Sequence, residues 1–167
     1  MRFVPSKKLA AVTLALAGLA AAPSSHAANA TGLLAVSAIV VSTCAVVATP
    51  LVFTNYALAI LDSTATITVT CTPDVLNYTV GLNEGLGAGS TTSTRKVTFL
   101  TNTLNYGLYR DTGRTQNWGN AAGVDTQPSS AGTGTLVKLF TVYGQMPAGQ
   151  TGAIGTYLDT VQINVVY

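Results

Sequence analysis

Histidine is almost absent from this chain of 167 residues, and charged residues make up only 8% of it. The single histidine is His26, near the N-terminus, and Glu84 is the single glutamate. The chain after this N-terminal region contains no histidine, so it has no Ser-His-Asp or Cys-His nucleophile system and no imidazole metal ligand. Its five aspartates are scattered with no local pairing. We therefore expect no enzyme, no catalytic residue, no metal site and no cofactor.

Basic charge is concentrated at the N-terminus. Residues 1–8 carry three of the eight Lys and Arg, residues 9–22 are uncharged and apolar, and small residues follow up to Ala27. This pattern predicts a secretory signal peptide over residues 1–27, with Ala30 as a second candidate cleavage position. The apolar run is shorter than the ~20 residues that span a bilayer, so we expect no membrane span after cleavage. The rest has five basic and six acidic residues and no basic run longer than two, which argues against a nucleic-acid partner.

Only two cysteines are present, Cys44 and Cys71, and both follow the predicted signal peptide. An even number of cysteines in an exported chain predicts a disulfide. In the chain-entropy description, closing the loop between them stabilises the fold by roughly 3–4 kcal/mol. That is a large part of the stability of an ordinary domain.

Strand signals dominate the 140 residues after Ala27, which suit one domain. Residues 64–70 alternate threonine with apolar residues, and no segment after the predicted signal peptide shows a helical period of helix length. Four further segments have the same strand character, at residues 76–82, 103–109, 136–143 and 161–167. Segments rich in Gly, Ser, Thr and Pro separate them, at residues 85–94, 120–134 and 145–155. Short strands between turn clusters predict an all-β, antiparallel sandwich of immunoglobulin-like type.

Residues 33–41 read LLAVSAIVV, without charge, proline or glycine. An exposed strand of this composition aggregates, so it must be covered. It is either the first strand of its own domain or a strand donated to a neighbouring subunit, and the residues alone do not separate the two. For a donated strand we expect the face with Leu34, Val36, Ala38 and Val40 to be buried in the neighbour. The opposite face carries the polar Ser37.

Several blocks of the sequence resemble the spore coat protein U domain family. The run Val36-Ser37-Ala38-Ile39-Val40, followed by Cys44 and Thr49-Pro50-Leu51-Val52-Phe53, is similar to the start of that domain. Later blocks agree in order, among them Leu104-Asn105-Tyr106-Gly107-Leu108-Tyr109-Arg110-Asp111, Trp118-Gly119, Val142-Tyr143-Gly144-Gln145-Met146-Pro147 and Gly155-Thr156-Tyr157-Leu158-Asp159. One departure is Thr54, where the family usually has a glycine after the phenylalanine.

The resemblance extends to pilins of archaic (Csu-type) chaperone–usher pili, and the chain looks like a major subunit. It implies an incomplete immunoglobulin-like sandwich that a donor strand from a neighbouring subunit completes. It further implies a homo-polymer, a periplasmic chaperone, an outer-membrane usher, and export through the periplasm to a surface pilus that supports attachment and biofilm formation. The expected order is a signal peptide at 1–27, a donor segment at 28–43 and the pilin sandwich at 44–167.

Two other functions fit the sequence. One is a self-contained secreted spore or cell-coat protein, in which residues 33–41 pair within their own domain. The other is a small carbohydrate-binding module, in which the exposed indole of Trp118 stacks on a sugar. Trp118 more often caps the core of a small sandwich, so surface binding is the weaker of its two interpretations.

Overall fold

The computed structural model describes residues 31–129 and 137–167, and this part of the chain contains strands and no helix. No helix long and apolar enough to cross a membrane is found in it. The predicted signal peptide, residues 1–27, lies outside the described residues. The chain divides into two units, Met1–Ala38 and Ile39–Tyr167, and all the strands belong to the second unit.

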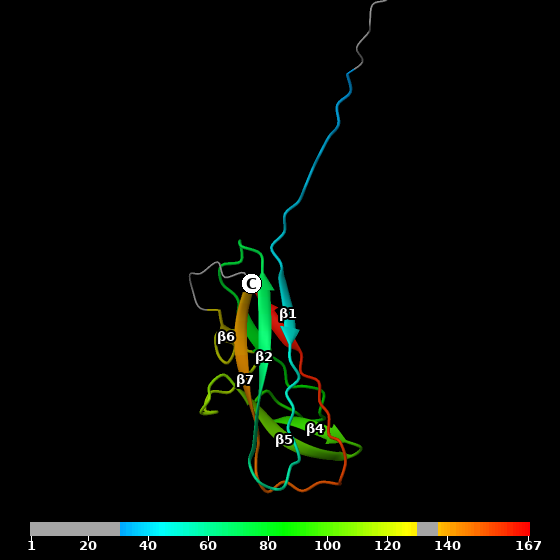
Figure 1. The fold of residues 1–167 in the computed structure, drawn as a ribbon, viewed down its shortest axis with the longest axis vertical. Helices are drawn as coiled ribbons and strands as arrows, with labels where there is room; N and C mark the ends of the chain where they lie inside the picture. The colour runs from blue at the N-terminus through cyan, green and yellow to red at the C-terminus, as the bar shows by residue number, and fades with distance from the viewer. Residues whose placement is uncertain (1–30, 130–136) are drawn as a thin grey trace, which may run out of the picture. The chain divides into compact units, whose positions relative to one another are not determined.

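The strands form two antiparallel sheets (Figure 1). In order along the chain they are β1 (Cys44–Ala48), β2 (Leu61–Cys71), β3 (Thr79–Leu82), β4 (Arg95–Phe99), β5 (Asn102–Tyr109), β6 (Gln127–Pro128), β7 (Val137–Met146) and β8 (Ile163–Val166). One sheet has the order β1-β2-β7-β5-β4, and the other has the order β6-β3-β8. The fold class predicted from the sequence, an all-β antiparallel sandwich, is therefore confirmed.

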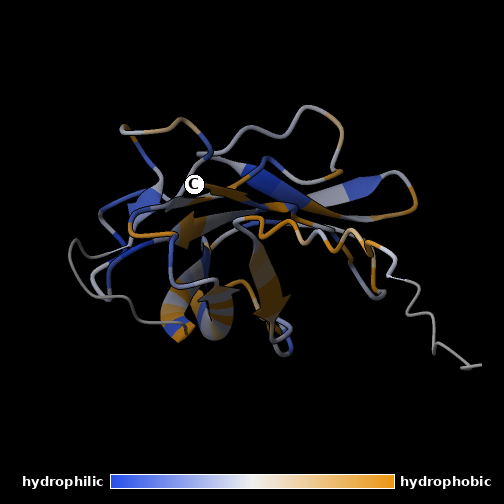
Figure 2. Ribbon diagram, turned by 90° about the horizontal axis from the view of Figure 1, so that it is seen from above, coloured by the Kyte–Doolittle hydropathy of each residue, from blue (hydrophilic) through white to orange (hydrophobic). Residues whose placement is uncertain are grey.

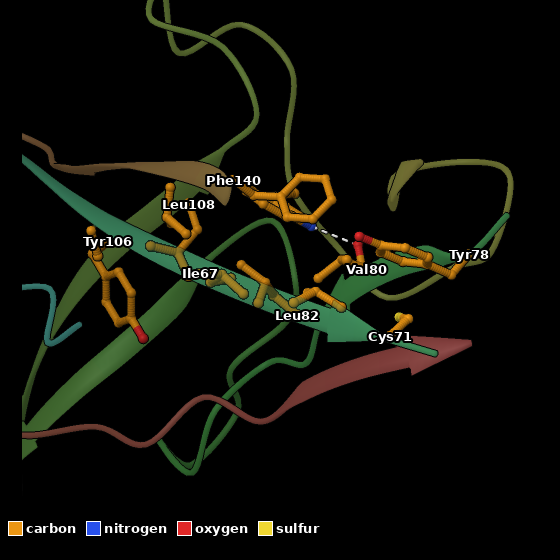
Figure 3. Close-up of a cluster of buried hydrophobic side chains, with 12 residues drawn as sticks. Ile67, Cys71, Tyr78, Val80, Leu82, Tyr106, Leu108 and Phe140 are labelled. Carbon is orange, nitrogen blue, oxygen red and sulfur yellow. Dashed lines mark hydrogen bonds between the residues drawn. The ribbon is translucent and has the colours of Figure 1, made fainter. Parts of the chain in front are cut away.

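The core lies between the inner faces of the two sheets. On β2 the alternation seen in the sequence places Ala65, Ile67 and Val69 inside, while the threonines between them face outward. Opposite them, Val80 and Leu82 of β3 are buried as well. Figure 3 shows this cluster of side chains, which come from β2, β3, β5 and β7 and, outside the strands, from Tyr78 and Trp118. A two-residue period on strands of both sheets is what a sandwich requires.

Several strands differ from the sequence-based prediction. The strand predicted over residues 76–82 is shorter, because β3 begins only at Thr79 and Leu76 is exposed. Tyr78, just before β3, donates its backbone N–H to Ser129 Oγ at 2.9 Å instead of entering the ladder. Strand β6 (Gln127–Pro128) lies inside a segment predicted as a loop, and β7 extends to Met146, past the predicted end at Tyr143.

Candidate functional site

One side of the sandwich is bounded by two edge strands, β1 and β8. Among the described strands, β1 pairs only with β2, and β8 pairs only with β3. The two edges come close together, as Figure 1 shows for the cyan β1 and the red end of the chain. Each has a free backbone edge with unpaired N–H and C=O groups, which is what a further strand needs in order to pair.

The apolar side chains along these two edges are only partly buried. They are Cys44 and Val46 on β1, Leu51 and Phe53 just after it, and Val161, Ile163 and Val165 on β8 and the residues before it. All of them pack against the core, yet each keeps part of its surface in contact with solvent. We call these seven residues, with the free edges of β1 and β8, the open side. Among the described strands, no other pair of edge strands is in contact.

The segment that precedes the open side in the sequence is exposed along its whole described length. Residues 31–41 belong to no strand, and every one of them is exposed. Val36, for example, is 84% exposed. In Figure 2 these residues form a mostly orange run directly after the grey part of the chain. The predicted donor residues Leu34, Val36, Ala38 and Val40 are thus exposed, and so are Leu33, Ile39 and Val41 on the other face.

A disulfide joins Cys44 to Cys71, as the cysteine count predicts. The two cysteines are also partners in the β1–β2 register, so the bond fastens the first residue of β1 to the last residue of β2. Just before it, Ser42 donates a hydrogen bond to the carboxylate of Asp74. This bond is the main cause that lowers the pKa of Asp74. The entrance to β1 is therefore fixed by a covalent bond and a polar contact.

Arg95 is the most buried charged residue of the described chain, at 0% exposed. Its Nε donates to Asn83 O at 2.7 Å, and one terminal nitrogen donates to both Leu82 O and Trp118 O at 2.8 Å. A further bond runs from Nη1 to Thr92 O at 2.6 Å. Burial lowers the pKa of Arg95, which nevertheless stays protonated because guanidinium is a very weak acid. No local pattern could predict this role, because only the fold brings these carbonyl groups together around Arg95.

Tyr106 and Asp159 form a second polar contact near Arg95. The Tyr106 hydroxyl donates to Asp159 Oδ2 at 2.6 Å, and Tyr106 is the register partner of Arg95 in the β4–β5 pair. Burial raises the pKa of Tyr106, and its hydrogen bond to Asp159 raises it further. Both residues belong to blocks that carry the family resemblance, but their contact joins positions far apart in the sequence.

Trp118 lies in the core, which agrees with the stronger of its two interpretations and not with a surface-binding indole. It is 1% exposed, and its indole N–H donates to Val80 O at 2.8 Å. Its ring packs edge-on against Phe140 at a centroid distance of 6.3 Å. A hollow of 210 Å³ beside it is shared with Arg110 and Tyr143, but the indole offers no free face there. Stacking of Trp118 on a sugar therefore has no structural basis.

No group of three or more His, Cys, Asp and Glu that could hold a metal ion occurs among residues 31–129 and 137–167. The aspartates have structural contacts instead. Asp111 accepts the backbone N–H groups of Thr115 and Gln116, and the bond from Gln116 is the main cause that lowers its pKa. Asp62 pairs with Arg114 at 3.2 Å. These contacts organise the loop that follows β5.

Comparison with known proteins agrees with this geometry. The Spore Coat Protein U domain matches residues 30–164. Protein U of Myxococcus xanthus is 32% identical over 122 residues, which cover 70% of this chain and 66% of that protein. A solved structure, the CsuC–CsuE chaperone–tip adhesion subunit pre-assembly complex from archaic chaperone–usher Csu pili of Acinetobacter baumannii, has a similar fold. The TM-score is 0.55 at 21% identity, and the match covers 77% of this chain and 40% of that chain.

The family match extends from just before the exposed apolar segment to residue 164 in β8, and so includes the segment and every residue of the open side except Val165. The resemblance noted in the sequence is thereby confirmed. The family is structural and non-enzymatic, and the chain is not an enzyme. This chain belongs to the Spore Coat Protein U domain family.

Proposed function

We propose that this chain is a structural subunit of a chaperone–usher surface pilus. In this proposal the signal peptide, residues 1–27, directs the chain through the periplasm, and residues 28–43 of one copy complete the sandwich of the next copy. A periplasmic chaperone covers the open side until an outer-membrane usher adds the subunit to the polymer. The assembled pilus supports attachment and biofilm formation.

The observation that carries this proposal is the exposed apolar segment, residues 31–41. Nine consecutive residues, 33–41, contain one polar side chain and no charge, and none of them is buried. Burying a valine or leucine side chain is worth about 1.5–3 kcal/mol, so leaving this segment in water forgoes several such gains. A segment of this kind is stable only when another surface covers it.

The open side offers such a surface. A strand that pairs with the free edge of β8 extends the three-stranded sheet to four strands and covers Ile163, Val165 and, across the sandwich, Val46. Backbone hydrogen bonds supply affinity in this mode of recognition, and alternate side chains supply specificity. Leu34, Val36, Ala38 and Val40 are the alternate side chains that we expect to face the core of the neighbouring copy.

The solved complex supports a chaperone as a partner. That structure holds a subunit of Csu pili together with a chaperone, and this chain has a similar fold over most of its length. The alternative, a self-contained coat protein, requires residues 33–41 to pair within their own domain. In the structure the first strand begins only at Cys44, after that segment. This favours the pilus subunit.

The test compares two neighbouring substitutions, Val36→Asp and Ser37→Asp, in the chain expressed with a chaperone and an usher. Polymers are read as ladders on SDS gels of unboiled samples. Val36→Asp buries a charge in the neighbour and should abolish the ladder, because a carboxylate in an apolar site is strongly disfavoured. Ser37→Asp faces outward and should leave the ladder intact.

Deletion of residues 28–41 should also remove the ladder while leaving the Cys44–Cys71 disulfide able to form. Ladders that persist after this deletion would show that the polymer does not use the N-terminal segment. A parent chain that runs as a stable monomer with no need of a chaperone would favour the coat-protein alternative.

A further inference from the structure

Strand β8 is held by few contacts of its own ladder. It spans only Ile163–Val166 and pairs with the equally short β3 (Thr79–Leu82). The other edge of that sheet, β6, has two residues. Sheets this small are marginally stable without support from elsewhere. Contacts outside the ladder must therefore fix the position of β8.

Asp159 supplies one such contact, four residues before β8. Its Oδ2 accepts the Tyr106 hydroxyl at 2.6 Å, and Tyr106 belongs to β5 of the five-stranded sheet. Its Oδ1 accepts the backbone N–H groups of Leu86 at 2.7 Å and of Thr160 at 2.8 Å. The chain that leads into β8 is thereby tied both to the opposite sheet and to the loop that follows β3.

The backbone passes close to the Asp159 carboxylate at Gly85. Gly85 has φ +82°, and a Cβ there would lie 2.2 Å from Asp159 Oδ2. A side chain at this position would therefore clash with the carboxylate, in a backbone conformation that non-glycine residues rarely adopt. The loop after β3 and the Asp159 carboxylate are in close contact.

Asn83 and Arg95 complete the arrangement. Asn83 Oδ1 accepts the backbone N–H of Gln162 at 2.7 Å, and the Asn83 N–H donates to Gln162 O at 3.0 Å, directly before β8. Arg95 in turn fixes the carbonyls of Leu82 and Asn83 at the end of β3. The four side chains thus fix the end of β3 and the start of β8 together.

We propose that Asp159, Tyr106, Asn83 and Arg95 are positioning residues that hold the free edge of β8 ready to receive the donor strand. This proposal rests on the function proposed above. The anchored end of β8 is its start, while Val166 and Tyr167 at its other end are exposed. An edge that is already fixed loses less conformational freedom when a strand pairs with it, and preorganisation of this kind favours binding. The four residues act on the donor strand only through the backbone of β8.

The test uses two matched substitutions that each remove one hydroxyl, Tyr106→Phe and Tyr56→Phe. Tyr56 is the control, because its hydroxyl also makes hydrogen bonds, to Pro147 O at 2.6 Å and from Gln150 N at 2.9 Å, away from Asp159. The exported full chain is purified, and its monomeric fraction, in which no second copy fills the open side, is isolated by gel filtration. Amide hydrogen exchange is then measured for β8 and, as an internal reference, for β2. In parallel, the rate of capture of a fluorescent synthetic peptide of residues 31–43 is measured.

Tyr106→Phe should speed exchange in β8 about tenfold, as expected for loss of a hydrogen bond to a charged group, and leave exchange in β2 unchanged. It should also slow peptide capture several-fold, whereas Tyr56→Phe should do neither. Asp159→Asn should reproduce the effect of Tyr106→Phe.

Two results would overturn the positioning role: β8 exchange that does not change, or exchange that rises equally in β2 and β8. The second would mark a general loss of stability. A monomeric parent chain that captures no peptide would instead refute the proposed function. The acceptor role of β8 would fall with it, while the exchange measurement would still report whether Tyr106 anchors that strand.

Discussion

A single guanidinium group holds three segments of this chain together. Arg95 donates to carbonyls at the end of β3, at Thr92 in the preceding loop and at Trp118, all within 2.8 Å. Removing a charged group from water costs several kcal/mol, so burial is favourable only when such bonds replace the lost hydration. Hydrogen bonds from a charged donor are about twice as strong as neutral ones. Arg95 therefore organises the loops around it while its own burial depends on them.

Replacement of this side chain should be costly. Arg95→Met keeps an apolar stem of similar length but leaves four carbonyl oxygens without their donor. We expect the free energy of unfolding to fall by roughly 3–5 kcal/mol. The neighbouring Lys96→Met is the control, since its Nζ makes an exposed contact with Ala88 O at 3.2 Å, and we expect a loss below about 1 kcal/mol. Urea unfolding followed by circular dichroism measures both values. Similar losses for the two variants would contradict the role assigned to Arg95.

At the scale of elements, β1 is an edge strand that is attached to the sheet on one side only. It has five residues and pairs only with β2 among the described strands, in a register from Cys44↔Cys71 to Ala48↔Ile67. The disulfide lies at the first pair of this register. Edge strands this short fray from their ends, so a covalent bond at the end limits fraying where the exposed N-terminal segment enters the sandwich.

Removal of both cysteines tests this element. The double substitution Cys44→Ala and Cys71→Ala should lower the free energy of unfolding by roughly 3–4 kcal/mol, the value for closing a loop of this length. Amide exchange in β1 should rise more than in β7, which is paired on both sides. The reduced parent is the comparison: it should lose the same stability, and reductant should have no effect on the double variant. Exchange that rises uniformly in all strands would refute the view that the bond protects β1.

Some strands could be predicted from the sequence and others could not. Residues 64–70 alternate so regularly that their inward face, with Ile67 and Val69, was predictable, and β2 confirms it. Strand β4 (Arg95–Phe99) was not predicted, because a buried arginine at its start interrupts the apolar pattern. The burial of the Arg95 side chain depends on the backbone carbonyls of residues 82, 83, 92 and 118, which only the fold brings together.

The candidate site also has one part that could be predicted from the sequence and one part that could not. The apolar run that contains Leu34 and Val36 could be identified from the sequence, because its residues are contiguous. The open side is different, because it depends on which strands become sheet edges. Sheet order is set by long-range pairing, such as β2 with β7. Local patterns carry no information about that pairing, so Val46 and Ile163 could not be assigned to one surface before the fold was known.

At the scale of the whole molecule, the proposed donor segment and the open side are two different surfaces of one chain. A contact between different surfaces is heterologous, and it continues from copy to copy unless the rotation closes a ring. A pair of chains joined in this way still has one unused donor segment and one unused open side. Growth into a fibre, and not a closed dimer, is the expected result of this arrangement. A donor segment that fills the open side of its own chain would stop this growth.

A second copy of residues 31–43, attached after Tyr167 through a short Asn-Gly-containing turn, should fill the open side of its own chain. Strand β8 ends at Val166, so a tight turn there returns the added segment antiparallel to β8 along its free edge. Burial of the added Leu34, Val36 and Val40 side chains is worth roughly 5–8 kcal/mol. With the original residues 28–43 removed, this chain should be a monomer in light scattering, and its thermal unfolding midpoint should lie well above that of the unextended chain. An extension with the Val36→Asp substitution should lose this gain, and one with Ser37→Asp should keep it. If all three extended chains unfold at the same temperature as the unextended one, the free edge of β8 is not where the segment binds.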